Sequence, residues 1–272
     1  LIMSGDSKKR LIFSIYTRVE EDKGFVSKRQ NHMNQFETHF DKLKYGLENY
    51  ANICNADFKL IQPDVQHFDN LNNYKIELWE DFCEDYDEVL YFDFDIIPNT
   101  TKNIFESFDF NKLVCVMLDT PISRFVYSKE DLDNKERFYK TLDKYHWLVK
   151  TKQYHHMLMS EMIQPKTEWM INTAVFGGNK TFRDKLKFST RLLTHQHVID
   201  EIKDMDNRYF YNNEIIICYS LEKYNLLDDV QRLPQHWYGD VFNDSDLRLC
   251  HTHYINHIYS KDFGSVFKTL NL

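Results

Sequence analysis

Glycine is scarce in this sequence. It occurs 7 times in 272 residues, whereas average usage is about 7% of a chain. No two glycines have G-x-G spacing, and no Gly-Lys pair precedes a serine or threonine. The glycine-rich loops that cradle phosphates in P-loop and dinucleotide-binding proteins are therefore excluded. Any phosphate that this protein binds must be held by another arrangement of side chains.

Paired cysteines and long hydrophobic runs are also missing. The five cysteines are scattered and form no Cys-x-x-Cys motif, which predicts buried free thiols in a reducing compartment. No run approaches the roughly 20 apolar residues of a membrane span, and no secretory signal peptide is recognisable. We therefore expect no transmembrane segment, and a cytoplasmic protein, or one in the host cytoplasm if the source is a virus.

Positive charge is in deficit. The chain carries 34 basic and 42 acidic residues, so its formal net charge is −8. This balance argues against nucleic acid as the main partner. Aromatic residues, by contrast, are abundant at 15%, and most of them are expected in the core.

Apolar runs alternate with helical periodicities along the chain. Strands are predicted at 11–16, 58–61, 88–92, 113–118, 169–176 and 247–254, and helices at 33–54, 71–86, 190–205 and 213–224. The charged segment 121–167 predicts a helical insertion. This order favours an α/β fold with a mostly parallel central sheet flanked by helices, in one Rossmann-like domain over residues 1–272.

An acidic pair ends the strand predicted at 88–92. Asp93 and Asp95 follow the apolar run directly, and ligands of open α/β sheets bind at the carboxyl ends of the strands. Carboxylate pairs suit hard divalent cations such as magnesium or manganese. A cation held there can bridge diphosphate oxygens, in place of the missing glycine loop. The alternative is that both aspartates belong to an ordinary turn.

Two histidines and a third aspartate extend this candidate site. His251 and His253 are two residues apart on a predicted strand, so both point to one face, and imidazole is a good manganese ligand beside carboxylates. Either one can be the third ligand, or both can be structural. Asp119 ends the strand predicted at 113–118, where it can contact a sugar hydroxyl or simply belong to a turn.

The segment around the acidic pair resembles a known family. Tyr86-Asp87-Glu88-Val89-Leu90-Tyr91-Phe92-Asp93-Phe94-Asp95 is similar to the "Y-D-x-V-L-Y-x-D-x-D" block of family 8 glycosyltransferases, the glycogenin-like and bacterial galactosyltransferase-like group with the GT-A fold. Three later blocks follow in the family's order: Trp169–Phe176, Asn212-Asn213-Glu214 and Leu249–His253. Two departures are that amides stand at 212 and 213 in place of carboxylates, and that no Lys-Pro-Trp follows His251.

The resemblance implies a metal-dependent enzyme that uses a nucleotide sugar, expected to be UDP-linked, with a glycan, protein or lipid as acceptor. Asp93, Asp95 and His251 or His253 would hold the metal. Amides would orient the donor sugar, namely Asn172, Asn212 and Asn213, with Glu214 beside them. The resemblance also assigns donor contacts to Lys75, to the loop residues Tyr16, Thr17 and Arg18, and to Phe94. Lys75 can equally be a solvated helix residue, and Tyr16 can equally be core.

The stereochemical course stays open at this point. A retaining reaction needs little from a protein nucleophile, whereas an inverting one needs a carboxylate base, for which the candidates are Asp119, Glu214 and Asp240. Trp237 and Tyr238 lie in a polar segment and are predicted to form an aromatic platform for an acceptor sugar.

Two other functions fit parts of the sequence. A haloacid-dehalogenase-like phosphatase also places D-x-D after an apolar strand, and Gly239-Asp240 matches its late acidic motif. However, Ile97 and Pro98 depart from that pattern. A non-catalytic nucleotide-sugar-binding protein is the second alternative, suggested by the amides at 212 and 213.

Overall fold

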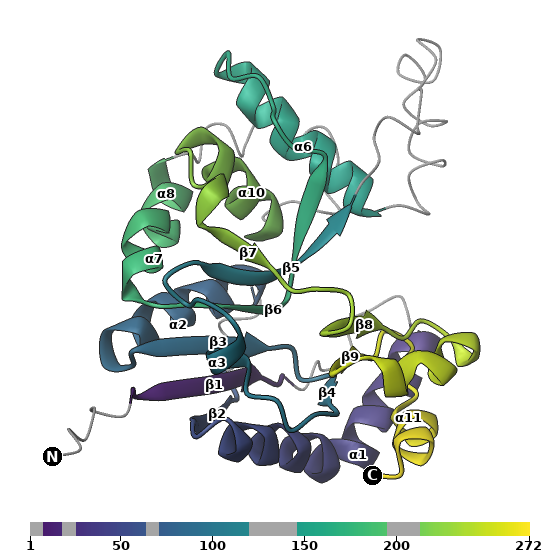
Figure 1. Cartoon of the computed structure of the whole chain (residues 1–272). Coiled ribbons are helices and arrows are strands. Elements are labelled where there is room, and N and C mark those ends of the chain that lie inside the picture. The colour runs from purple at the N-terminus through teal and green to yellow at the C-terminus, as the bar shows by residue number, and fades with distance from the viewer. Residues whose placement is uncertain (1–7, 18–25, 64–70, 120–145, 195–212) are drawn as a thin grey trace, which may run out of the picture.

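The computed structural model describes residues 8–17, 26–63, 71–119, 146–194 and 213–272. Over these ranges the chain forms two β-sheets with helices packed around them (Figure 1). The larger sheet has six strands and the smaller has three.

The central sheet has the strand order β2-β1-β3-β6-β5-β7. Its strands are β1 Arg10–Ile15, β2 Asp57–Ile61, β3 Glu88–Phe92, β5 Leu113–Asp119, β6 Trp169–Gly178 and β7 Val230–Arg232. β1 is parallel to both β2 and β3, and β5 is parallel to β7. Only β6 among these strands is antiparallel to its neighbours. The predicted mostly parallel α/β sheet is confirmed.

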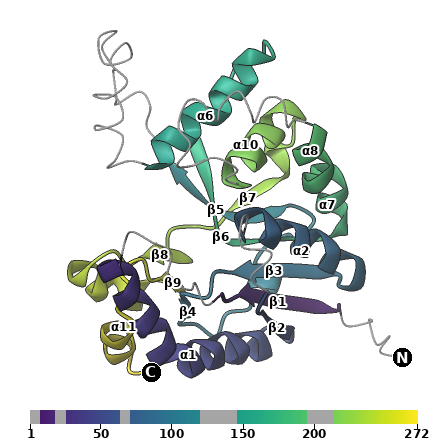
Figure 2. The same ribbon diagram turned by 180° about the vertical axis from the view of Figure 1, so that it is seen from behind.

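Helices cover both faces of this sheet (Figure 2). They are α1 Val26–Ile53, α2 Leu71–Asp85, α3 Ile104–Ser107, α6 His146–Ser160, α7 Lys180–Leu186, α8 Phe188–Thr194, α10 Asn213–Lys223 and α11 Phe263–Leu270. Leu11 and Phe13 of β1 pack into a core with α2, α6, α7, α8 and α10, whereas Ile12 packs into a core with α1, α3 and α11. The alternation follows from the two-residue period of a strand.

The long helix α1 shows how the sequence builds one of these layers. Leu43, Leu47, Tyr50 and Cys54 recur at steps of four, three and four residues, and all four side chains are buried. This spacing places them on one face of a helix. Burying a leucine of this kind stabilises the fold by about 1.5–3 kcal/mol, so the stripe fixes α1 against the sheet.

The small sheet lies beside the carboxyl end of β3. Its strands are β4 Ile96–Pro98, β8 Tyr238–Asp240 and β9 Ile255–His257, in the order β4-β9-β8. β4 is antiparallel to β9, and Ile96 pairs with His257. The short chain from Asp93 to Asp95 therefore leads from one sheet directly into the other.

The strand predicted at 247–254 is wrong. Residues Asp244–Thr252 form the 3-10 helix η5, and the strand begins only at Ile255. Asn243 caps η5 in a reciprocal capping box with Asp246, which satisfies backbone donors at the helix start. Leu247 and Cys250 are three residues apart, which matches the period of a 3-10 helix.

Other predictions are tested only in part. Most of the segment 121–167 lies outside the described residues, and α6 is its described helix. The helix predicted at 190–205 is described only at its start, in α8. All five cysteines are buried and unpaired, as predicted. Within the described ranges, no helix combines the length and the apolar character needed to cross a bilayer.

Candidate metal centre at the carboxyl end of strand β3

The turn after β3 carries the two aspartates. All of β3 is buried, and the N–H of Asp93 donates to the carbonyl of Ala174 on the neighbouring β6 at 2.8 Å. The N–H of Ile96 donates back to the carbonyl of Asp93 at 3.0 Å, which closes a tight turn. Asp93 is partly exposed and Asp95 is buried. The apolar strand thus delivers both carboxylates to the edge predicted from the sequence.

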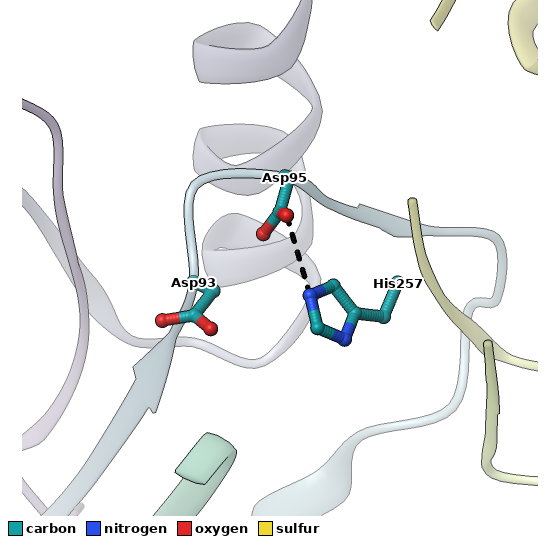
Figure 3. A group of neighbouring side chains, drawn as sticks. All are labelled: Asp93, Asp95 and His257. Carbon is teal, nitrogen blue, oxygen red and sulfur yellow. Dashed lines mark ion pairs between the residues drawn. The ribbon is translucent and has the colours of Figure 1, made fainter. Parts of the chain in front are cut away.

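His257 of β9 completes the group (Figure 3). Its Nε2 atom lies 3.2 Å from Oδ2 of Asp95. One ligand atom from each of Asp93, Asp95 and His257 lies within 4.8 Å of the others. Opposite ligands of a magnesium ion are about 4.2 Å apart, since each bond is about 2.1 Å. Two carboxylates and an imidazole at this spacing fit one magnesium or manganese ion.

The acidic and basic groups around Asp95 and His257 stabilise each other's charged forms. Burial alone would lower the pKa of His257, but the Asp95 carboxylate and the hydrogen bonds to Asp240 and Asp95 outweigh burial and raise it to about 9. Burial alone would raise the pKa of Asp95, but His257 and Lys261 outweigh it and hold that pKa well below its usual range. Asp95 is therefore a carboxylate that already has cationic neighbours.

Two residues of β8 orient the His257 ring. The hydroxyl of Tyr238 donates to Asp240 at 2.7 Å, and its oxygen lies 2.6 Å from Nδ1 of His257. With Tyr238 donating to Asp240, Nδ1–H donates to the Tyr238 oxygen, and Nε2 faces Asp95. A histidine fixed in this way through its far nitrogen is oriented to bind a metal through the near one, once Nε2 releases its proton.

Asp93 is held from β3 and α2. The hydroxyl of Tyr91 donates to Oδ1 of Asp93 at 2.6 Å, and the Lys75 ammonium lies 3.3 Å from the same oxygen. Lys75 also donates to the carbonyl of Thr173 at 3.0 Å and is buried. The structure therefore places Lys75 beside the acidic pair and not on a solvated helix face.

The amide residues lie next to the group, on β6 and α10. Asn172 accepts from the N–H of Ala174 at 2.8 Å and donates to the hydroxyl of Tyr259 at 3.0 Å. Asn213 donates to the Thr173 hydroxyl at 3.1 Å.

Glu214 follows Asn213 on α10. It accepts from the N–H of Thr173 at 3.1 Å and forms an ion pair with Lys150 of α6. Burial alone would raise the pKa of Glu214, but Lys150 and then Lys75 outweigh it and lower that pKa.

Several predicted site residues lie elsewhere or are not described. Tyr16 packs against Phe36, Phe40 and Phe94 with ring centroids 5.0–6.0 Å apart, and the Phe94 side chain is buried. Thr17 is partly exposed after β1. Arg18 and Asn212 lie outside the described residues. Asp119 ends β5, opposite Trp169 of β6, and its side chain lies outside the described part.

The late histidines and aromatic residues are placed differently from the sequence prediction. His251 is exposed on η5, and His253 packs against Gly239. His257, which the pattern did not single out, is the histidine beside Asp95. Trp237 and Tyr238 are both buried, so the predicted aromatic platform at these two residues is wrong. The apolar flanks Ile255 and Ile258 are the signal that could have placed His257 on a short strand.

Comparisons with known proteins give fold-level likeness only. No protein-family model matches the chain, and no curated protein matches it in sequence. Among solved structures, it is similar to a glycosyltransferase involved in the glycosylation of the major capsid of PBCV-1, with 11% identity over 97% of this chain and 98% of that one and a TM-score of 0.47.

Two further structures are similar to it. One is the galactosyltransferase LgtC in complex with donor and acceptor sugar analogues, with 11% identity, coverage of 96% and 94%, and a TM-score of 0.49. The other is mouse xyloside xylosyltransferase 1, with 10% identity, coverage of 92% and 98%, and a TM-score of 0.42. Because these scores lie below 0.5, the likenesses carry no weight for the activity of this chain.

Proposed function

We propose that this chain is a metal-dependent glycosyltransferase of the GT-A kind that moves a sugar from a nucleoside diphosphate, most simply UDP, to an acceptor. The observation that carries the proposal is the group of Asp93, Asp95 and His257 at the carboxyl end of β3. The similarity of residues 86–95 to the family 8 block supports it, as does the lack of a glycine loop for phosphates. The assignment of residues 1–272 to a single domain belongs to the same proposal.

Asp93, Asp95 and His257 would hold manganese or magnesium. His257 thus takes the role for which the sequence offered His251 or His253. When bound, such an ion offsets the negative charge that develops on a departing diphosphate. The buried carboxylate of Asp95 suits this task because its pKa lies well below the usual range, so it stays ionised.

The chain's own residues would orient the donor sugar. Asn172 is fixed at both ends of its amide by Ala174 and Tyr259, and Asn213 is fixed by Thr173. Since these amides lie beside the acidic pair, they are placed to bind sugar hydroxyls. Lys75, between Asp93 and Thr173, sets the position of Asp93.

Two of the three candidate bases for an inverting reaction, Glu214 and Asp240, are already bonded, and the side chain of the third, Asp119, lies outside the described part. Glu214 is paired with Lys150 and accepts from Thr173, while Asp240 accepts from Tyr238 and faces His257. A carboxylate that is already stabilised by a cation or a hydrogen bond is a weak general base. Neither residue is therefore well suited to activate an acceptor hydroxyl in an inverting reaction.

Thermal unfolding with and without manganese tests this proposal. UDP, GDP and CDP are compared. We expect UDP, and at most one of the other two, to raise the Tm, and only when manganese is present. Asp95→Ala should abolish the shift, whereas Asp81→Ala, at an exposed position of α2, should keep it. A chain that shows no manganese-dependent shift with any of the three nucleotides contradicts the proposal. Magnesium-dependent hydrolysis of p-nitrophenyl phosphate that is lost in Asp93→Ala would favour the phosphatase alternative.

A further inference from the structure

Two aromatic rings are stacked beside the candidate metal centre. The centroids of Phe242 and Tyr259 are 4.7 Å apart, and the ring planes are inclined by only 12°. Phe242 follows β8 and Tyr259 follows β9, two residues beyond the parallel pairing of Asp240 with His257. The small sheet therefore brings both rings out at the same end, from the segments that follow its two parallel strands.

Tyr259 connects this stack to the candidate site. Its ring centroid lies 4.1 Å from that of His257, and its hydroxyl accepts a hydrogen bond from Asn172 at 3.0 Å. Asn172 is the amide that the proposed function places beside the donor sugar. The stack thus begins at the candidate metal ligand and at this amide, and it ends in Phe242 at the surface.

Phe242 is a half-exposed aromatic residue. Its side chain is 48% exposed, although phenylalanine is among the residues most often buried. One face of the ring is stacked on Tyr259. The backbone is held in place, because the N–H of Phe242 donates to Asp246 at 2.9 Å. A rigid, half-exposed ring beside a reactive centre is suited to stacking on a flat, partly apolar ligand.

The charges nearby restrict the chemistry of that ligand. Asp240, Asp244 and Asp246 all lie within four residues of Phe242, whereas the cations Lys261 and His257 lie against Tyr259, so an anionic group is disfavoured at Phe242 itself. The apolar C–H face of an uncharged sugar can stack on the ring while its hydroxyls reach carboxylates or water. From these observations, and resting on the proposed function, we infer that the Phe242–Tyr259 stack is the acceptor subsite and binds a neutral sugar ring on Phe242.

Binding to an array of immobilised neutral oligosaccharides tests the inference. The full chain is applied with manganese and the nucleotide that stabilises it. We expect wild type to bind at least one glycan, Phe242→Ala to weaken that binding at least tenfold, and Phe242→Tyr to retain it. Tyr45→Ala is the matched control, because Tyr45 is an aromatic residue of α1 that is 69% exposed. It should bind as wild type does.

Two outcomes of the binding assay overturn the inference: no glycan binds, or Phe242→Ala binds as tightly as wild type. The manganese-dependent Tm shift with nucleotide is measured on the same samples. If wild type itself lacks this shift, the proposed function fails; if the shift is present but glycan binding does not depend on Phe242, only the acceptor subsite fails. If Phe242→Ala loses the nucleotide shift, the ring stacks on the donor base and the acceptor assignment is overturned.

Discussion

The ammonium group of Lys261 forms an ion pair with Oδ2 of Asp95. The same oxygen faces Nε2 of His257 at 3.2 Å. Lys261 reaches this position with a left-handed backbone, φ 58°, which residues other than glycine adopt uncommonly. A metal ion that binds Asp95 must therefore share this oxygen with the lysine or displace it.

Replacing this lysine should strengthen metal binding. In Lys261→Met the ammonium no longer competes for Asp95, so we expect the Kd for manganese alone to fall by about 3- to 10-fold, as expected for loss of one partly exposed ion pair. Electron paramagnetic resonance of free manganese measures this directly. Lys268→Met, at an exposed position of α11, should leave the Kd unchanged. Weaker manganese binding in Lys261→Met would contradict competition at Asp95.

Removing one hydroxyl should loosen the other aspartate. Tyr91 is buried and donates to Asp93 at 2.6 Å, so Tyr91→Phe leaves the carboxylate held only by the longer contact with Lys75 among the contacts described above. We expect manganese affinity to fall by about tenfold and the free energy of unfolding to fall by about 1 kcal/mol. Calorimetric titration and urea unfolding give the two values, with Tyr45→Phe as the exposed control. Unchanged manganese affinity would show that Tyr91 does not orient Asp93.

The Lys150–Glu214 ion pair should make stability depend on pH. The pKa of Glu214 is below its ordinary value of 4.5 in the folded chain. Its contribution is therefore complete above pH 4.5 and is lost as the pH falls through the folded pKa. Lys150→Met leaves a buried carboxylate without its closest cation, so we expect a loss of about 3–5 kcal/mol at pH 7.

Urea unfolding at pH 5 and pH 7 checks this prediction. The loss of unfolding free energy in Lys150→Met should be smaller at pH 5 than at pH 7, because Glu214 can then take up a proton in the folded state. Adding Glu214→Gln to Lys150→Met should recover part of the lost stability, since the unpaired charge is gone. Equal deficits at both pH values would mean that Glu214 remains stabilised without Lys150.

Two glycines should respond to alanine in opposite directions. A Cβ atom at Gly177 of β6 would lie 2.8 Å from both the Phe110 ring and the carbonyl oxygen of Val89, so Gly177→Ala should destabilise the chain by about 1–3 kcal/mol. A Cβ at Gly46 of α1 meets nothing within 4 Å, so Gly46→Ala should stabilise it by about 0.5–1 kcal/mol. The urea-unfolding midpoints of the two variants, each compared with wild type, measure these changes in stability. Similar shifts in both variants would contradict the close packing around β6.

The first half of the fold could be predicted because its signals are local. The apolar run before Asp93 marks a buried strand, and the spacing of Leu43, Leu47 and Tyr50 marks a helix face; each pattern lies within one element. The position of Asp93 and Asp95 at the end of β3 then follows from the general rule for α/β sheets.

The remainder of the site depends on pairings that the sequence does not display. Leu247 and Leu249 alternate as in a strand, but Asn243 and Asp246 cap a 3-10 helix there. The strand therefore lies at Ile255–His257, and His257 stands beside Asp95 in place of the predicted His251 or His253. The contacts of Lys75 with Asp93 and of Lys150 with Glu214 join separate elements. Such contacts arise only when the helices pack on the sheet.

The turn between Asp93 and Asp95 is anchored at its two ends to different sheets. The backbone of Asp93 bonds to β6 of the central sheet, whereas the carbonyl of Asp95 accepts from the N–H of Ile258, next to β9. The relative position of the two aspartates therefore depends on contacts with both sheets. A substitution that moves the small sheet would change the distance between the two metal ligands without contacting either one. An ion bound to both aspartates would, in turn, hold the two sheets in one relative position.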